Sequence, residues 1–241
     1  MPAPILTGGN NGLVTRTRQG GNAAATLSFS INVPSGSNFL IVAVSAALTT
    51  SNAGRTGPTF GGAAMTHYMS IFVPSSYYKR EIFYLVNPPV GTNTFTVNYG
   101  TMTNFTIGGI AAVFSNVDTS SPIVNYASGN WSGYTTVAAI TSDPEYYVLS
   151  LVTAQDDSGF DNQSTSCNYT NYTGNKSSFE DYDRTYTRGF WHDAGGKTGT
   201  AGSNTITWSQ PLGTPSGSNP YWHNFNIRGK KSAQTQVIWF M

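Results

Sequence analysis

The feature that most constrains this chain is an alternation of apolar and polar residues with a period of two. In residues 27–33 (LSFSINV) and 94–99 (TFTVNY), apolar side chains alternate with Ser, Thr or Asn. In a β-strand this alternation places one face on a core and the other in water. The run FLIVAV at residues 39–44 is continuously apolar instead, which predicts a strand that is covered on both faces.

Short apolar segments of this kind recur along the chain, with Gly, Pro, Asn and Asp between most of them. No segment shows the 3.6-residue period of an amphipathic helix with a charged outer face. Only 10% of the residues are charged, so Ser, Thr and Asn must supply most of the polar surface that contacts water. Aromatic residues make up 13% of the chain and, like Thr, they favour β-strands. About ten short strands at this spacing predict an all-β, antiparallel β-sandwich that is jelly-roll-like and has little helix.

The segment EIFYLVNPPVGTNTFTVNYG, residues 81–100, shows how these strands are connected. Pro88 and Pro89 cannot continue a β-ladder, and Gly91 gives the chain the freedom to turn. The sequence therefore predicts a strand, a stiff connector and a second strand.

The predicted domain organisation has three parts. Residues 1–22 form a polar N-terminal arm, residues 23–229 form a single β-sandwich domain with a long loop at 155–204, and residues 230–241 form a C-terminal strand or arm. The net charge is +1 without a basic stripe, which argues against nucleic acid as a partner and against a polybasic membrane anchor. The start of the chain does not resemble a signal peptide, and the longest apolar run is too short to span a bilayer, so no membrane partner is expected.

Several segments occur in an order that resembles a known module. They are SFSINVPSGSNFLIVAVS, TFGGAAMT, EIFYLVNPPVGTNTFTVNY, IAAVFSNVDTSSPI, YYVLSLVTAQDDSG and NTITWSQPLGTPSGSNPYWHNFNIRG. Together they resemble a β-sandwich module of bacteriophage virion structural proteins, which also recurs in some bacterial surface proteins. The resemblance covers about residues 24–229. It implies a fibre head, capsid decoration or adhesin piece, and it implies no catalytic residues.

The C-terminal end is a candidate assembly contact. Val237, Ile238, Trp239, Phe240 and Met241 are five consecutive apolar residues. They would form a sticky patch if exposed, so we expect them to be covered. Two alternatives stay open: a final strand folded back on its own sheet, or an arm that docks on a neighbouring subunit.

Aromatic residues in polar segments are the candidate glycan-binding residues. They are Trp131, Tyr134, Tyr169, Tyr172 and Trp191. Aromatic planes beside Asn and Asp suit a sugar, which stacks on the ring and hydrogen-bonds to the polar groups. The alternative is that these rings attach the loop to the sandwich or fill a subunit contact.

Acidic and other reactive residues give weaker signals. Asp156, Asp157 and Asp161 are weak calcium candidates, but QDDSGFDN also has the composition of an ordinary solvated turn. Glu180, Asp181 and Asp183 could serve a glycosidase only if they faced each other across a cleft, and a solvated loop is the simpler interpretation. Cys167 has no partner base in sequence, and His67, His192 and His223 lack a metal-ligand spacing. No metal site and no cofactor are predicted.

These observations favour a non-enzymatic bacteriophage virion structural protein, a capsid decoration or fibre-head component that acts through subunit assembly. Its expected partners are other copies of itself and other virion proteins such as the capsid, and its expected location is the virion, after synthesis in the host cytoplasm. The alternative is a glycan-binding module for host attachment. A carbohydrate-active enzyme is a third and weaker alternative.

Overall fold

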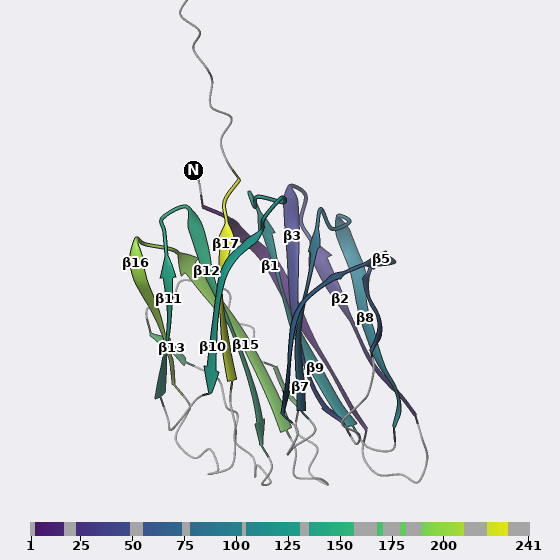
Figure 1. The fold of residues 1–241 in the computed structure, drawn as a ribbon. Helices are drawn as coiled ribbons and strands as arrows, with labels where there is room; N and C mark the ends of the chain where they lie inside the picture. Colours follow the sequence, from purple (N-terminus) through teal and green to yellow (C-terminus); the bar gives the residue numbers. More distant parts are fainter. Residues whose placement is uncertain are drawn as a thin grey trace, which may run out of the picture.

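A computed structural model describes residues 3–16, 23–48, 55–73, 78–102, 105–130, 135–156, 168–170, 179–181, 189–209 and 221–230. These residues form seventeen strands in four antiparallel sheets, and none of them is helical. Figure 1 shows the sheets edge-on, stacked side by side, and we number them I to IV from the right of that view. The prediction of an all-β, antiparallel sandwich is confirmed.

Sheets I and II are built from β1–β9, which we call the first unit. Sheet I has the order β2 (Ala23–Val33), β8 (Gly91–Met102), β4 (Thr56–Phe60) and β5 (Ala63–Ala64). Sheet II has the order β1 (Ile5–Arg16), β9 (Phe105–Ser115), β3 (Ser37–Leu48), β7 (Tyr78–Val86) and β6 (Thr66–Val73).

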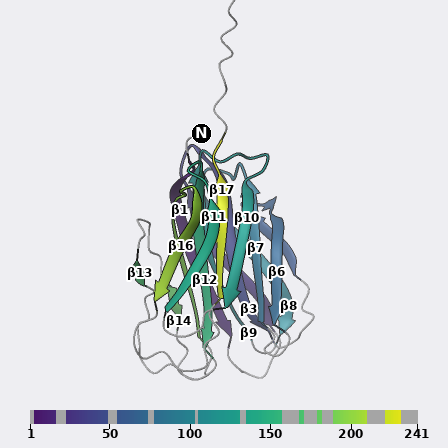
Figure 2. The same cartoon turned by 60° about the vertical axis from the view of Figure 1, so that its left-hand side comes forward.

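Sheets III and IV are built from β10–β17, which we call the second unit. Sheet III has the order β10 (Ile123–Asn130), β17 (Tyr221–Arg228), β12 (Tyr146–Asp156), β15 (Gly189–Thr198) and β14 (Phe179–Asp181). Sheet IV has the order β11 (Thr135–Ser142), β16 (Gly202–Ser209) and β13 (Asn168–Thr170). Figure 2 brings sheet IV forward, with β11 and β16 in front of sheet III.

The two units have the same topology. In the first unit the outermost strands in sequence pair with each other and the next strands pair inside them: β1 lies beside β9, β2 beside β8, and β3 beside β7. This nested pairing is the order of a jelly roll. The second unit repeats it strand for strand, with β10 beside β17, β11 beside β16 and β12 beside β15. The sequence predicted one sandwich over residues 23–229, whereas the structure contains two sandwiches in series.

Sheets II and III pack face to face and join the two units. In β3, Leu40, Val42 and Val44 belong to the core between sheets I and II. The alternate residues Phe39, Ile41 and Ala43 belong to the core between sheets II and III. Successive side chains of a strand point to opposite faces. The prediction that FLIVAV is covered on both faces is therefore confirmed.

Tight turns gather at one end of the stack, which we call the turn end. The connector after β7 ends at Gly91 as the sequence predicted, and Asn93 donates from Nδ2 to the carbonyl of Pro89 at 3.1 Å. Gly61 has a φ of +55° in the predicted Gly-Gly bend, where an added Cβ would lie 2.9 Å from Asn93 Oδ1 and would clash. The opposite end of the stack is called the far end.

Two predicted boundaries differ from the observed strands. Within the predicted N-terminal arm, β1 pairs along its length with β9 and forms one edge of sheet II. Within the predicted loop at 155–204, β15 pairs with β12, and a turn at 199–201 leads into β16. Residues 5–16 lack clear alternation of apolar and polar residues, which is why β1 escaped the pattern, whereas the apolar segment TRGFWH at 187–192 had indicated a strand that overlaps β15.

Candidate functional site

The strands of the second unit end together at the far end. The terminal register pairs there are Asn130 with Tyr221, Thr135 with Ser209, and Asp156 with Gly189. The chain between β10 and β11 and the chain between β16 and β17 therefore leave the fold at this same end. This matters because Trp131 and Tyr134 occur between β10 and β11, and Trp191 follows Gly189 by two residues on β15.

Register places two of those aromatics on the sheets that border this end. Trp191 pairs with Ala154 in sheet III, and Tyr169 pairs with Trp208 in sheet IV. Only the backbone of Trp191 and Tyr169 is described. Trp131, Tyr134 and Tyr172 lie outside the described residues.

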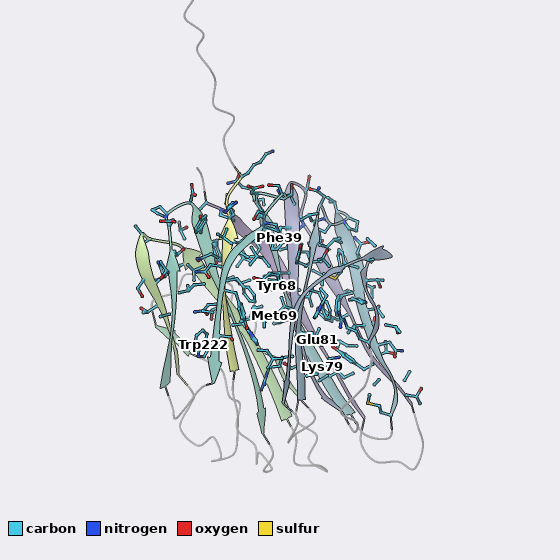
Figure 3. All side chains as sticks on the ribbon, in the orientation of Figure 1. Phe39, Tyr68, Met69, Lys79, Glu81 and Trp222 are labelled. Carbon is cyan, nitrogen blue, oxygen red and sulfur yellow. The ribbon has the colours of Figure 1, made fainter. Side chains whose placement is uncertain are left out.

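Trp222 is an aromatic residue at this end that the sequence patterns did not single out. It lies on β17, pairs with Val152 and Gly129, and is half-buried. A Cβ added to Gly129 would lie 2.7 Å from Cζ2 of the indole, so the ring rests directly on the glycine backbone. Figure 3 shows Trp222 in the lower half of the second unit, toward the far end.

A row of buried amides continues from Trp222 along β17. Asn224 and Asn226 are 0% and 1% exposed. They alternate with Phe225 and Ile227, which belong to the core between sheets II and III, so the amides face sheet IV. Accordingly, Asn226 Nδ2 donates to the carbonyl of Thr141 on β11 at 2.6 Å.

The amides in this row are only partly hydrogen-bonded. Ser150 Oγ donates to Asn224 Oδ1 at 2.6 Å. Asn224 Nδ2 and Asn226 Oδ1 are buried and find no hydrogen-bond partner within the described part of the chain. A buried amide atom without a partner costs about 1–3 kcal/mol, so the interior between sheets III and IV has unused capacity to donate and to accept a hydrogen bond. The sequence signal was Trp-Xaa-Asn-Xaa-Asn at residues 222–226, an alternation in which amides replace core residues.

The first unit carries an ion-pair cluster in the corresponding place. Equivalent positions in the two units can be counted from the tight turns before β3 and β12, which make Phe39 equivalent to Tyr147. Counting along the two strands from there makes Val44 equivalent to Val152. Glu81 pairs with Val44 and Asp193 pairs with Val152, so the two acids occupy equivalent positions. The sequence patterns missed this cluster because its members come from β6, β7, β8 and the residue before β4.

Glu81 is 0% exposed, and both of its carboxylate oxygens are used. Oε2 accepts a hydrogen bond from Tyr99 at 2.6 Å, and Oε1 lies 2.8 Å from Nη1 of Arg55. His67 Nε2 and Lys79 Nζ are 3.6 and 3.7 Å from the same oxygen. The only acid of sheets I and II is thus neutralised inside the fold, as in a structural ion pair.

Burial controls the protonation of the groups around Glu81. It raises the pKa of Tyr99 well above its usual value, and the Glu81 charge raises it further, so Tyr99 keeps its proton and donates. Burial and the neighbouring Arg55 lower the pKa of His67. His67 is therefore neutral at pH 7, and the cluster reduces to one carboxylate with two cations.

His223 is buried between sheets II and III. Its Nδ1 is 2.8 Å from the Tyr126 hydroxyl, and its ring stacks with those of Tyr126 and Phe225. Complete burial, assisted by the charge of Arg80, lowers the pKa of His223 to about 3. The sequence predicted a structural histidine at this position. These contacts support that prediction.

Most of the other site residues predicted from the sequence lie outside the residues that the structure describes. Asp156 ends β12, and Glu180 and Asp181 lie in β14, with only their backbones described. The other predicted residues lie outside the described residues: Asp157, Asp161, Cys167, Asp183, Val237, Ile238, Trp239, Phe240 and Met241.

Within the described ranges, no three His, Cys, Asp or Glu side chains come together as a metal site. The described chain also contains no helix that is long and apolar enough to cross a bilayer.

Comparison of the chain with protein-family models, with curated proteins and with solved structures gives no match.

Proposed function

We propose that the protein is a non-enzymatic structural component of a bacteriophage virion, a capsid decoration or fibre-head component that works by assembly with other copies and with other virion proteins. The observation that carries this proposal is the pair of jelly-roll units joined through sheets II and III. Jelly rolls recur in viral capsid proteins and in lectins. This is an association at the level of fold, and it joins the sequence resemblance in favouring a virion.

The outer face of sheet I supports a role on an exposed, unreactive surface. Its residues on β2 and β8 are neutral and hydroxyl- or amide-bearing, and they hydrogen-bond across the strands. Ser28 Oγ is 3.2 Å from Thr96 Oγ1, and Asn98 Nδ2 donates to Thr26 Oγ1 at 2.8 Å. Ser30, Asn32, Thr92 and Thr94 lie on the same face of β2 and β8 and are exposed.

Assembly can be tested by the mass of the protein in solution, measured by light scattering on the full chain and on a version that ends at Lys230. Lys230 is kept because its amide donates to the carbonyl of Asn116 at 2.9 Å. We expect the full chain to assemble and the shortened protein to be a folded monomer. Two folded monomers would contradict self-assembly through residues 231–241.

A second candidate function is host attachment through a glycan. The observation that favours it is the convergence of Trp222 with the strand ends that border Trp131, Tyr134, Tyr169 and Trp191. The two functions are compatible, because a fibre-head protein can both assemble and bind a receptor.

A further inference from the structure

We propose that the edge of sheet II at β6 accepts residues 237–241 of a second copy of this chain, which add to the sheet as an antiparallel strand. The proposal rests on the proposed function of assembly and names the surface through which assembly occurs. It also chooses between the two alternatives that the sequence left open for the apolar C-terminal residues, because it places them on a neighbouring subunit.

The fold leaves β6 unusually exposed for an edge strand. Three edge strands of more than three residues have side chains that are described along most of their length: β2, β6 and β10. In β6, Thr66, His67 and Tyr68 are consecutive exposed residues, and Ser70 is exposed as well. Exposed and buried residues alternate along β2, and most of β10 is half-buried. Of the three, β6 is therefore the strand that has most room for a neighbour.

The sequence of β6 lacks the features that normally keep an edge strand from pairing. THYMSIFV contains no Lys, Arg, Asp, Glu or Pro, and it is rich in β-branched and aromatic residues. Its one irregularity is the bulge between His67 and Met69. From Met69 to Val73 the register with β7 is continuous, so this stretch is a regular template for a further strand.

Tyr68, Met69 and Ile71 form an apolar rim on β6, where the edges of sheets II and III meet. The ring centroid of Tyr68 is 6.2 Å from that of Tyr126 on β10 and 6.1 Å from that of Phe225. Tyr68 is nevertheless 36% exposed, and Met69 and Ile71 are half-buried. Figure 3 shows Tyr68 and Met69 between the two units. An added strand with apolar side chains would cover surface that the described fold leaves open.

Residues 237–241, VIWFM, have the chemistry that this edge requires. All five are apolar, and they include β-branched and aromatic residues, which favour strands. The preceding residues 232–236, SAQTQ, carry no charge, so no side-chain charge would be buried when the segment joins the sheet. Main-chain hydrogen bonds to the edge would provide affinity, and alternate side chains would pack on the apolar rim.

The described chain ends at the turn end, which limits where residues 237–241 can reach. Gly229 forms a bridge with Val117, and the backbone of Val117 both donates to and accepts from the side chain of Asn38. Strand register then gives the level of β6: Ser70 lies level with Val44, two strands away, and Val44 is six residues along β3 from Asn38. Ser70 is therefore about 20 Å from Gly229 along the strand direction.

This distance excludes antiparallel pairing within one chain. Because β6 runs from the turn end to the far end, an antiparallel strand must enter from the far end. The link 231–236 allows Val237 to lie at most about 25 Å from Lys230. To place Val237 opposite Ser70 of its own chain, the link would have to run about 20 Å, cross the 10 Å or so between sheets III and II, and then reverse. The straight path alone uses almost the whole link, so no residues remain for the turn.

The arrangement that stays open to a single chain is parallel pairing, in which residues 237–241 would run along β6 from the turn end. Every strand pair among the described residues is antiparallel. Parallel pairing is also slightly less stable per residue. Addition to another copy is therefore favoured, and the two arrangements give different cross-links.

The test is cross-linking of full-length chains by a short bismaleimide, with Cys167→Ser in every chain to remove the native thiol. Chains with Ser70→Cys or Thr66→Cys are mixed with mass-tagged chains that carry Val237→Cys or Met241→Cys. We expect products between chains. Val237→Cys should link preferentially to Ser70→Cys. Met241→Cys should link preferentially to Thr66→Cys, because an antiparallel strand brings Met241 to the turn end of β6.

Matched controls use Ser28, an exposed serine on the edge strand β2. Ser28→Cys in place of Ser70→Cys should give little product. A second measurement leaves the C-terminal residues intact: Ser70→Lys should raise the concentration for half-maximal assembly about tenfold, because a charge on an edge strand opposes pairing. Ser28→Lys should leave that concentration unchanged, and thermal melts verify that both variants are folded.

Each contrary outcome is decisive. A cross-link within one chain that carries both Ser70→Cys and Val237→Cys, a preference of Val237→Cys for Thr66→Cys, or equal product with Ser28→Cys would overturn the proposal. Light scattering on the same samples separates it from the proposed function. Assembly that needs residues 231–241 but is unchanged in Ser70→Lys rejects the β6 edge alone, whereas a full chain that stays monomeric rejects both.

Discussion

The two units have one topology and two kinds of interior. Between sheets I and II, rings and aliphatic side chains fill the space, and the one acid is enclosed by Arg55 and Tyr99. Between sheets III and IV, equivalent positions hold Ser150 and the amides of β17. The described part of this second interior thus places polar side chains at positions where the first unit has apolar ones.

The difference has an energetic meaning. The first unit has an apolar core of its own, whereas the described apolar side chains of sheet III that join a core cluster face sheet II. The shared core between sheets II and III therefore contributes to the stability of the second unit. This frees its other interior to carry polar groups at a cost in stability.

The largest expected effect comes from the first unit. Phe83 is 0% exposed and occupies the position equivalent to Gly195. Phe83→Ala should cost about 3–5 kcal/mol of unfolding free energy, because it leaves a cavity under Phe95. Urea unfolding followed by circular dichroism measures this loss.

Tryptophan fluorescence tests the coupling of the units in the same experiment, because all five tryptophans follow residue 130. Loss of the first unit uncovers the shared core, so we expect the fluorescence midpoint to fall together with the circular dichroism midpoint. A fluorescence midpoint at the wild-type value would show that the second unit is stable without the first.

The next effect concerns the ion-pair cluster. Glu81→Gln removes the charge that compensates Arg55 and Lys79, and it should destabilise the protein by about 3 kcal/mol. The control is Lys79→Met, which leaves Glu81 paired with Arg55 and should cost less than about 1 kcal/mol. Equal losses in the two variants would mean that the carboxylate is not the centre of the cluster.

A smaller effect is a dependence of stability on pH through His223. Its folded pKa of about 3 lies below its unfolded value of 6.5, so the unfolded chain binds more protons between these values. The stability is complete above pH 6.5 and is lost as the pH falls, by about 2 kcal/mol between pH 6.5 and 5. Urea midpoints at several pH values measure this slope. His223→Gln should flatten the dependence of stability on pH, while the control His67→Gln should leave most of this dependence in place. An unchanged slope in His223→Gln would contradict the assignment of the pH dependence to His223.

The smallest effect tests the polar interior. Ser150→Ala should cost about 1–3 kcal/mol, because it leaves the Asn224 amide without its hydrogen bond. The double change Ser150→Val with Asn224→Ala copies Val42 and Ala111 of the first unit and should restore nearly the wild-type stability. If the double variant is less stable than Ser150→Ala, the amides contribute to folding more than the comparison implies.

Much of the fold was predictable because its signals are local. Alternation in 27–33 and 94–99 predicted strands with one buried face, and the continuous run at 39–44 predicted a strand between two cores. The duplication was not predictable by this route. Equivalent positions hold Val42 and Ser150, or Phe83 and Gly195, so the topology repeats while the sequence pattern does not.

The candidate site was only partly predictable. Aromatic residues in polar segments indicated the same end of the second unit at which Trp222 lies, but Trp222 itself belongs to a segment that reads as an ordinary strand. Its role depends on Gly129, which is 93 residues away in sequence and adjacent in register. Contacts across such a distance come from strand pairing, which local patterns do not specify.

Asn116 has a practical consequence for handling the molecule. Its side chain donates to the carbonyl of Ala3, and its own carbonyl accepts from Lys230, so one residue anchors the backbone at both places. Both anchors lie at the turn end. An affinity tag or surface linker attached beyond Lys230 would consequently hold the protein by that end and present the Trp222 end to the medium, which is the orientation a biosensor experiment with sugars needs.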